Sequence, residues 1–205
     1  MAQRIAAQES VLNAILNQLP SSVLQRAVVD GFDTEAATTV AQWARDAGIP
    51  VIADLDEIYP GVEKLLRNVD YPIVSRDIPG RLTGEPDLEM ALRQMQRRYG
   101  CRLTAATLGD DGVLAWDGKQ SYHSPAFDVP VVDTTGAGDI FHAGFIYGLL
   151  QNWPLERQLD FACAAAALNC TAAGARGGIR PVAKIEELMA TGVRRHTPHY
   201  VSGLD

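Results

Sequence analysis

Cysteine and positive charge are scarce in this sequence, and long apolar runs are missing. Its 205 residues include three cysteines, Cys101, Cys163 and Cys170, and none stands in a Cys-x-x-Cys pair. That excludes a disulfide framework and a thiolate zinc site, and it predicts unpaired thiols in a reducing compartment. Lysine and arginine number 18 against 25 acidic residues, a formal net charge of -7. A nucleic-acid partner held by bulk positive potential is therefore not expected, and an anionic ligand would need a local binding device.

The apolar segments are too short or too interrupted to serve as membrane signals. Polar residues break the stretch 5–19, so it lacks the apolar centre of a signal peptide. No uninterrupted apolar segment reaches the length that spans a bilayer. We therefore expect a cytoplasmic protein with no membrane partner. Hydrophobic residues make up 47% and charged residues 21%, which is typical of a globular protein with one core.

Short apolar runs alternate with helical patterns along the chain. Strands are expected near 27–29, 50–53, 71–74 and 102–107, and helices near 34–47, 61–68, 87–99, 155–171 and after Pro181. A hairpin is expected at 113–116 and 120–123, turned by Asp117-Gly118. Because parallel strands need helical crossovers, this order predicts an α/β fold with a largely parallel sheet covered on both faces.

Three parts are expected along the chain. An N-terminal helical segment would occupy residues 1–26, because apolar residues there follow a mostly helical spacing before Pro20. One domain would occupy residues 27–192, since no linker or repeat divides it. A frayed tail would follow at residues 193–205.

The most informative segment is a glycine-rich turn that leads from a strand-like run into an apolar helix. It reads Thr134-Thr135-Gly136-Ala137-Gly138-Asp139. Such a turn presents free backbone N–H groups at the positive end of a helix, and its glycines let a ligand come close to the backbone. It can therefore hold phosphate without lysine or arginine, which suits an acidic protein.

Asp139 is unexpected at such a turn, because a carboxylate repels a phosphate unless it has a chemical task or a cation nearby. One interpretation is that Asp139 is a base that accepts the proton of a substrate hydroxyl, while the N–H groups stabilise charge on a transferred phosphoryl group. The other is that Asp139 only caps the helix, a common use of aspartate. The residues alone leave both open. His142, one turn later, is expected to support the site by packing or hydrogen bonding.

The run from Asp133 to Gly144 closely resembles the C-terminal motif of the PfkB-type, ribokinase-like carbohydrate kinases. The resemblance covers roughly residues 28–188 and includes Leu82-Thr83-Gly84 and the run 107–112 in the family's order. Val74-Ser75-Arg76-Asp77 is most similar to ketohexokinase-like members. The resemblance implies a ribokinase-like three-layer α/β/α fold and an ATP-dependent sugar kinase, with a sugar and ATP as partners and Mg²⁺ as cofactor.

The resemblance also assigns roles to particular residues. It places the base at Asp139 and the anion hole at the backbone of Gly136, Ala137 and Gly138. It implies a nucleotide site at the following residues: Thr107, Gly109, Gly112, Gly138, Cys163 and Gly174. It implies a monovalent cation, K⁺, near Asp133 and Thr135, with carbonyls near Asn169, Ala172 and Gly174. Cys163 and Cys170 face nearly the same way on one helix and are expected to be small core residues, with Cys163 touching adenine.

The sequence departs from the family in two places. Many members carry Asn-x-x-Glu just before the Leu-Thr-Gly, where this sequence has Ser75 and Ile78, so its magnesium surroundings differ. The family's front portion, which holds sugar-contacting residues and a strand lid, has no counterpart before Val28. We therefore expect a chain that is N-terminally truncated relative to the family, and a non-catalytic nucleotide-binding module is the alternative function. A homodimer stays open, because the family often dimerises through that lid.

Overall fold

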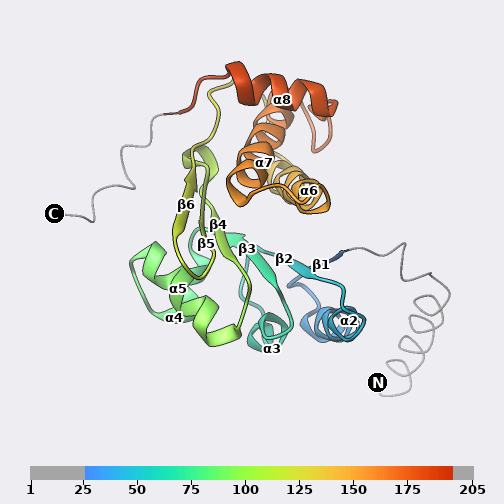
Figure 1. Cartoon of the computed structure of the whole chain (residues 1–205), viewed down its shortest axis with the longest axis vertical. Helices are drawn as coiled ribbons and strands as arrows, with labels where there is room; N and C mark the ends of the chain where they lie inside the picture. The colour runs from blue at the N-terminus through green and yellow to red at the C-terminus, as the bar shows by residue number, and fades with distance from the viewer. Residues whose placement is uncertain (1–25, 196–205) are drawn as a thin grey trace.

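The computed structural model describes residues 26–195, whose strands form one six-stranded sheet in the order β1 to β6 (Figure 1). Four strands are parallel: β1 (Ala27–Asp30), β2 (Val51–Leu55), β3 (Tyr71–Ser75) and β4 (Thr104–Thr107). β5 (Val113–Trp116) and β6 (Ser121–Ser124) form the antiparallel hairpin. The expected largely parallel sheet is confirmed. The expected helix in residues 1–26 and most of the expected tail lie outside the described residues.

Helices cover both faces of the sheet and complete a three-layer arrangement (Figure 1). One layer contains α2 (Thr34–Asp46), α3 (Val62–Leu66), α4 (Ile78–Thr83) and α5 (Leu88–Tyr99). Each of these helices connects strands that are neighbours in the sheet, and right-handed crossovers place such helices on one face. The other layer contains α6 (Ala137–Leu150), α7 (Leu155–Asn169) and α8 (Val182–Thr191). Within residues 26–195, no helix has the length and apolar character needed to cross a membrane.

The alternation of side chains along the strands creates a separate apolar core on each face. On β2, Leu55 packs with the α2–α5 layer, whereas Ile52 packs with α6 and α7. Leu92 anchors the first core and Phe145 the second, and each is fully buried. Burying a side chain of this size contributes about 1.5–3 kcal/mol. Because Phe145 belongs to α6 and packs in the same core as Ile52 of β2, this core fixes the position of α6 relative to the ends of the strands.

Helices α6 and α7 pack unusually closely because small residues face each other. A Cβ atom on Gly144 would lie 2.8 Å from Cα of Ala162. Ala162 is fully buried at this contact. This contact holds the glycine-rich start of α6 in a fixed position over the sheet.

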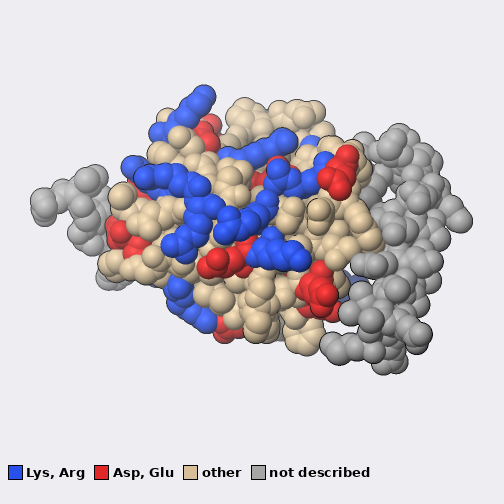
Figure 2. Space-filling view, turned by 90° about the horizontal axis from the view of Figure 1, so that it is seen from below, with Lys and Arg blue, Asp and Glu red and all other residues tan. Residues whose placement is uncertain are grey.

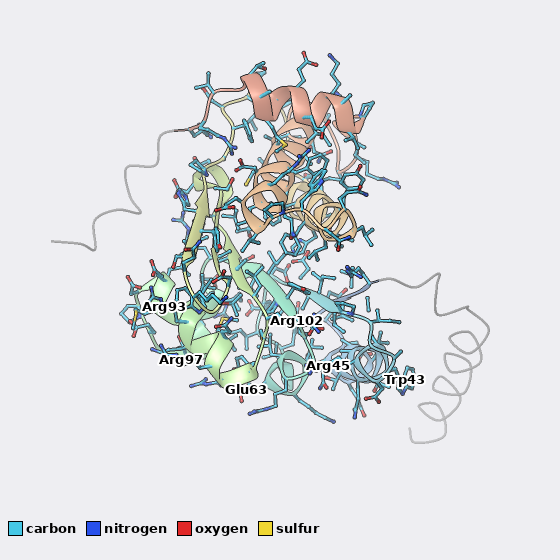
Figure 3. The ribbon with its side chains drawn as sticks, viewed as in Figure 1. Trp43, Arg45, Glu63, Arg93, Arg97 and Arg102 are labelled. Atoms are coloured by element: carbon cyan, nitrogen blue, oxygen red, sulfur yellow. The ribbon has the colours of Figure 1, made fainter. Side chains whose placement is uncertain are left out.

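Positive side chains gather on the layer of α2, α3 and α5, as Figure 2 shows from below. Each of these helices has basic residues in its last turn: Arg45 in α2, Lys64 in α3, and Arg97 and Arg98 in α5. Cations are favourable there because a helix C-terminus carries partial negative charge. Figure 3 shows Arg45, Arg97 and Arg102 on this layer, away from α6, α7 and α8. The basic face is thus accounted for by helix ends, and it lies on the opposite side of the sheet from the glycine-rich turn.

Candidate functional site

The start of α6 exposes unused backbone donors. Gly136 is the N-cap residue, with a φ of 74° that favours glycine, and a Cβ atom there would lie 2.6 Å from the Ala175 carbonyl oxygen. The N–H of Ala137 donates to the Thr134 carbonyl at 3.1 Å. The N–H groups of Gly136, Gly138 and Asp139 have no acceptor among the described residues. Three of the amides at this turn are therefore free to bind an anion.

The carboxylate of Asp139 is also unused. Asp139 is exposed and makes no hydrogen bond or ion pair with residues 26–195. Gly136 occupies the N-cap position, and no side chain caps this helix end. The capping interpretation of Asp139 is therefore wrong. The carboxylate of Asp139 is free and stands beside free amides. The interpretation of Asp139 as a base stays a prediction.

Asp133 ties the glycine-rich turn to the loop after α7. One carboxylate oxygen accepts the N–H of Thr135 at 2.9 Å, and the other accepts the N–H of Gly174 at 2.8 Å. These backbone hydrogen bonds stabilise the charged form and lower the pKa of Asp133. Asp133 and Gly174, two members of the expected cation set, are thus in direct contact.

Asn169 joins the same two segments from within the core. Its side chain is fully buried, and Nδ2 donates to the carbonyls of Thr135 at 3.2 Å and Ala175 at 3.1 Å. Its Oδ1 has no hydrogen-bond partner among the described residues. A buried acceptor without a donor fits a cation or an ordered water at this position. Asp133, Thr135, Asn169 and Gly174 therefore lie together, and the monovalent cation that the family resemblance implies among them stays a prediction.

A cavity of about 590 Å³ lies between the start of α6, one face of α7 and the turn after β4. That turn contains a 3-10 helix, η1 (Gly109–Asp111). Five of the expected nucleotide residues line the cavity: Thr107, Gly109, Gly112, Gly138 and Cys163. Gly174, the sixth, is not among the lining residues. Gly112 adopts a φ of 91°, and a Cβ atom there would lie 2.0 Å from the Ser124 carbonyl oxygen, so this turn requires glycine.

Much of the cavity wall was not expected from the sequence. The unexpected lining residues include Phe127, Val129, Val131, Ala166, Ala167, Cys170 and Arg195. Apolar and aromatic walls of this kind suit a planar base. The backbone of Arg195 donates to the Ala126 carbonyl at 2.8 Å, so residues near 195 form part of this wall.

One signal in the sequence could have located the α7 wall. Cys163, Ala166, Ala167 and Cys170 are spaced as one face of a helix, and all four line the cavity. Cys170 was expected in the core, but it is only partly buried and reaches the cavity. Burial raises the pKa of the Cys163 thiol to about 12, so Cys163 is an uncharged wall residue.

His142 connects the start of α6 to two strands. Its Nδ1 lies 2.8 Å from the Gly138 carbonyl and 3.3 Å from the Asp54 carboxylate, and its Nε2 lies 3.3 Å from the Ile73 carbonyl. His142 is buried, so the expected hydrogen-bonding role is confirmed. Burial raises the pKa of Asp54; His142 opposes this increase, and the negative charge of Asp139 adds to it. Asp54 and Asp139 therefore stand close enough to affect each other.

Replacing Asp54 by asparagine is expected to stabilise the protein at neutral pH. The raised pKa means that the folded protein holds this proton more tightly than the unfolded chain, whose Asp54 titrates near 3.8. The favourable contribution of Asp54 is thus fully present below pH 3.8 and is lost as the pH rises through the raised value. We expect the Tm of Asp54→Asn to exceed that of the parent at pH 7, and the gap to close toward pH 3.8.

Thermal melts at several pH values check this expectation, and Asp56→Asn is the control. Asp56 is an exposed aspartate at the same strand end, so its replacement should leave Tm unchanged. A parent protein that is as stable as Asp54→Asn at pH 7 would show that burial does not penalise the Asp54 charge.

Comparison of this sequence with known proteins identifies its family. The pfkB family carbohydrate kinase profile matches residues 2–181. The chain belongs to this family. The pfkB-family ribokinase of Bacillus subtilis (strain 168) is 40% identical over 156 residues, which are 76% of this chain and 52% of that enzyme. The ATP-dependent ribose-1-phosphate kinase of Halopiger xanaduensis is 33% identical over 146 residues, which are 69% of this chain and 47% of that enzyme.

A solved ribokinase structure confirms the ribokinase-like fold. The structure of Arabidopsis thaliana ribokinase complexed with ribose and ATP matches with a TM-score of 0.74 at 26% identity, over 80% of this chain and 55% of that one. This chain spans about half the length of the curated relatives described above. The ketohexokinase likeness of residues 74–77 stays a prediction.

Proposed function

We propose that this chain carries the ATP-binding and phosphoryl-transfer site of a sugar kinase. The observation that carries the proposal is the start of α6, where the free Asp139 carboxylate stands beside the free amides of Gly138 and Asp139. The apolar cavity opens on the same turn, through Ala137 and Gly138. A nucleotide whose adenine occupied the cavity would have its phosphates directed to these amides.

The residues suggest how transfer would proceed. The cavity binds adenine, and the amides at residues 136–139 hold the transferred phosphoryl group and stabilise its charge, with Ala137 contributing only if its bond to Thr134 opens. Asp139 takes the proton of a sugar hydroxyl as the sugar oxygen bonds to the γ-phosphorus. The bond from the γ-phosphorus to the bridging oxygen breaks, and ADP leaves.

Two cations belong to this proposal. Mg²⁺ neutralises phosphate charge in such reactions. Residues 26–195 contain no cluster of three His, Cys, Asp or Glu side chains that could hold a metal, so the phosphates themselves would supply most of its ligands. K⁺ would lie near Asp133, Thr135 and the unpaired Oδ1 of Asn169, where it would fix the turn that carries the amides.

The state of the thiols bears on the compartment, and the family of the chain bears on its partners. Cys101, Cys163 and Cys170 are all free, which supports a reducing, cytoplasmic compartment. The partners we propose are ATP and a sugar; a homodimer is compatible with this proposal but is not required by it.

A coupled assay for ADP, together with calorimetry, tests the proposed function. The purified chain is mixed with ATP, Mg²⁺ and K⁺, and then with ribose, fructose and related sugars. Sugar-dependent ADP formation is the expected result. ATP binding without turnover for any sugar would favour the alternative, a nucleotide-binding module. No ATP binding at millimolar concentration would contradict both.

A further inference from the structure

Phosphates at the start of α6 would meet carboxylates as well as amides. A helix N-terminus supplies only about half an elementary charge. Asp139 projects from this turn, and Asp54 lies near it. The basic face formed by the ends of α2, α3 and α5 is on the other side of the sheet (Figure 2). Binding of a polyphosphate at this edge therefore needs a cation close to the cavity.

Arg76 stands next to the turn that lines the cavity. Its Nη2 donates to the Leu108 carbonyl at 3.3 Å and to the carboxylate of Asp111, and its side chain is 53% exposed. Leu108 begins the turn, and Asp111 belongs to η1. The other two residues of η1, Gly109 and Asp110, line the cavity. The guanidinium is thus held at the nucleotide turn while it remains accessible to a ligand.

Strand β3 brings Arg76 beside the end of β4, from which the cavity turn begins. Ser75, the last residue of β3, is opposite Thr107, the last residue of β4. Ile73 on the same strand accepts the hydrogen bond from His142 that anchors the first turn of α6. Arg76 follows this strand directly. Arg76 itself is not among the lining residues of the cavity, so a phosphate chain would have to reach out of the cavity past the end of β3 to meet it.

Arg81 and Arg195, two other arginines near this edge, are less suited to the phosphates. Arg81 is bound by two carboxylates, those of Glu57 and Asp77, and these contacts raise its pKa. Arg195 lies at the opposite wall, 3.6 Å from Asp110 and 3.9 Å from Asp128. Arg76 has one carboxylate partner, and its own side chain is half-exposed, so water screens this ion pair and limits its contribution to stability. Replacing Asp111 by a phosphate as the partner of Arg76 therefore costs little free energy.

We infer that Arg76 binds the phosphate chain of the nucleotide, and that it exchanges its ion pair with Asp111 for phosphate oxygens when ATP enters. This inference rests on the proposed nucleotide site. Asp111 holds the guanidinium at the turn before the ligand arrives. The planar guanidinium can then engage two phosphate oxygens in a parallel, bidentate geometry that the ammonium group of a lysine does not offer.

Calorimetric titration with ATP and with adenosine separates phosphate binding from base binding. The proteins are the parent, Arg76→Ala, Arg76→Lys and the control Arg81→Ala, each checked by a thermal melt. Arg76→Ala should weaken ATP binding about 10- to 100-fold and change adenosine binding less than about twofold. Arg76→Lys should lose part of the ATP affinity, and Arg81→Ala should leave both affinities unchanged.

Three results would overturn the inference. Unchanged ATP affinity in Arg76→Ala would show that the guanidinium does not contact phosphate. Equal weakening of ATP and adenosine would show that Arg76 only shapes the turn. A parent chain that binds neither ligand would overturn the proposed function itself, whereas a parent that binds both restricts any failure to Arg76.

Discussion

Asp139→Asn is expected to lower the rate of phosphoryl transfer about 10²- to 10⁴-fold, the usual contribution of a general base. The asparagine keeps the size of the side chain but cannot accept the hydroxyl proton at neutral pH. ATP affinity should stay the same or increase, because a negative charge beside the phosphates is removed. The fold should not suffer, since the Asp139 side chain makes no hydrogen bond or ion pair within residues 26–195. Steady-state kinetics and an ATP titration measure the two effects.

Glu35→Gln is the matched control for Asp139→Asn. Glu35 is an exposed acidic residue in the first turn of α2, so its replacement tests the loss of a carboxylate at a helix start without the glycine-rich turn. It should leave the transfer rate unchanged. A transfer rate in Asp139→Asn within about threefold of the parent would remove Asp139 from the role of base.

Gly138→Ala should remove most phosphate affinity without disturbing the fold. A Cβ atom on Gly138 would have no protein atom within 4 Å, and Gly138 lines the cavity. Alanine also favours the helix more than glycine does, by about 1 kcal/mol. The added methyl group would occupy space that a phosphate needs to reach the amides. We expect ATP binding to weaken about 10-fold or more, with Tm unchanged or higher and adenosine binding kept.

Gly136→Ala provides the contrast within the same turn. Gly136 has a φ of 74°, and its Cβ atom would lie 2.6 Å from the Ala175 carbonyl oxygen. This variant should lose stability together with ATP affinity. If Gly138→Ala bound ATP as tightly as the parent, the backbone at residue 138 would not approach the phosphates.

The sheet and most helices were predictable because local patterns determine them. The runs 50–53 and 71–74 predict buried parallel strands, which the structure extends to 51–55 and 71–75, and Gly100, the glycine that follows α5, marks a helix end. Helix α4 was not expected, because Pro79 and Gly80 lie within its sequence. Proline is acceptable in the first turn of a helix, where its missing N–H would have no intrahelical partner. The pattern of apolar residues alone could not show that a helix begins at Ile78.

The central residues of the site were predictable, whereas its walls were not. The glycine-rich motif predicts Asp139 and Gly138 because this part of the candidate site consists of residues that are adjacent in sequence. Phe127 and Arg195 reach the cavity through contacts between distant segments, and no local pattern indicates them. Asn169 was expected to offer a carbonyl, but its buried side chain is what joins the two loops.

The central claim is that the free amides at the start of α6 receive the phosphates of a nucleotide whose base occupies the cavity. Amide-resolved NMR during a titration with ATP and then with adenosine tests it most directly. ATP should shift the amide signals of Gly138 and Asp139 strongly, together with those of Gly109 and Gly112. Adenosine should shift the signals of Gly109 and Gly112 and leave those of Gly138 and Asp139 near their free positions. ATP-induced shifts that spare Gly138 and Asp139 would contradict the claim.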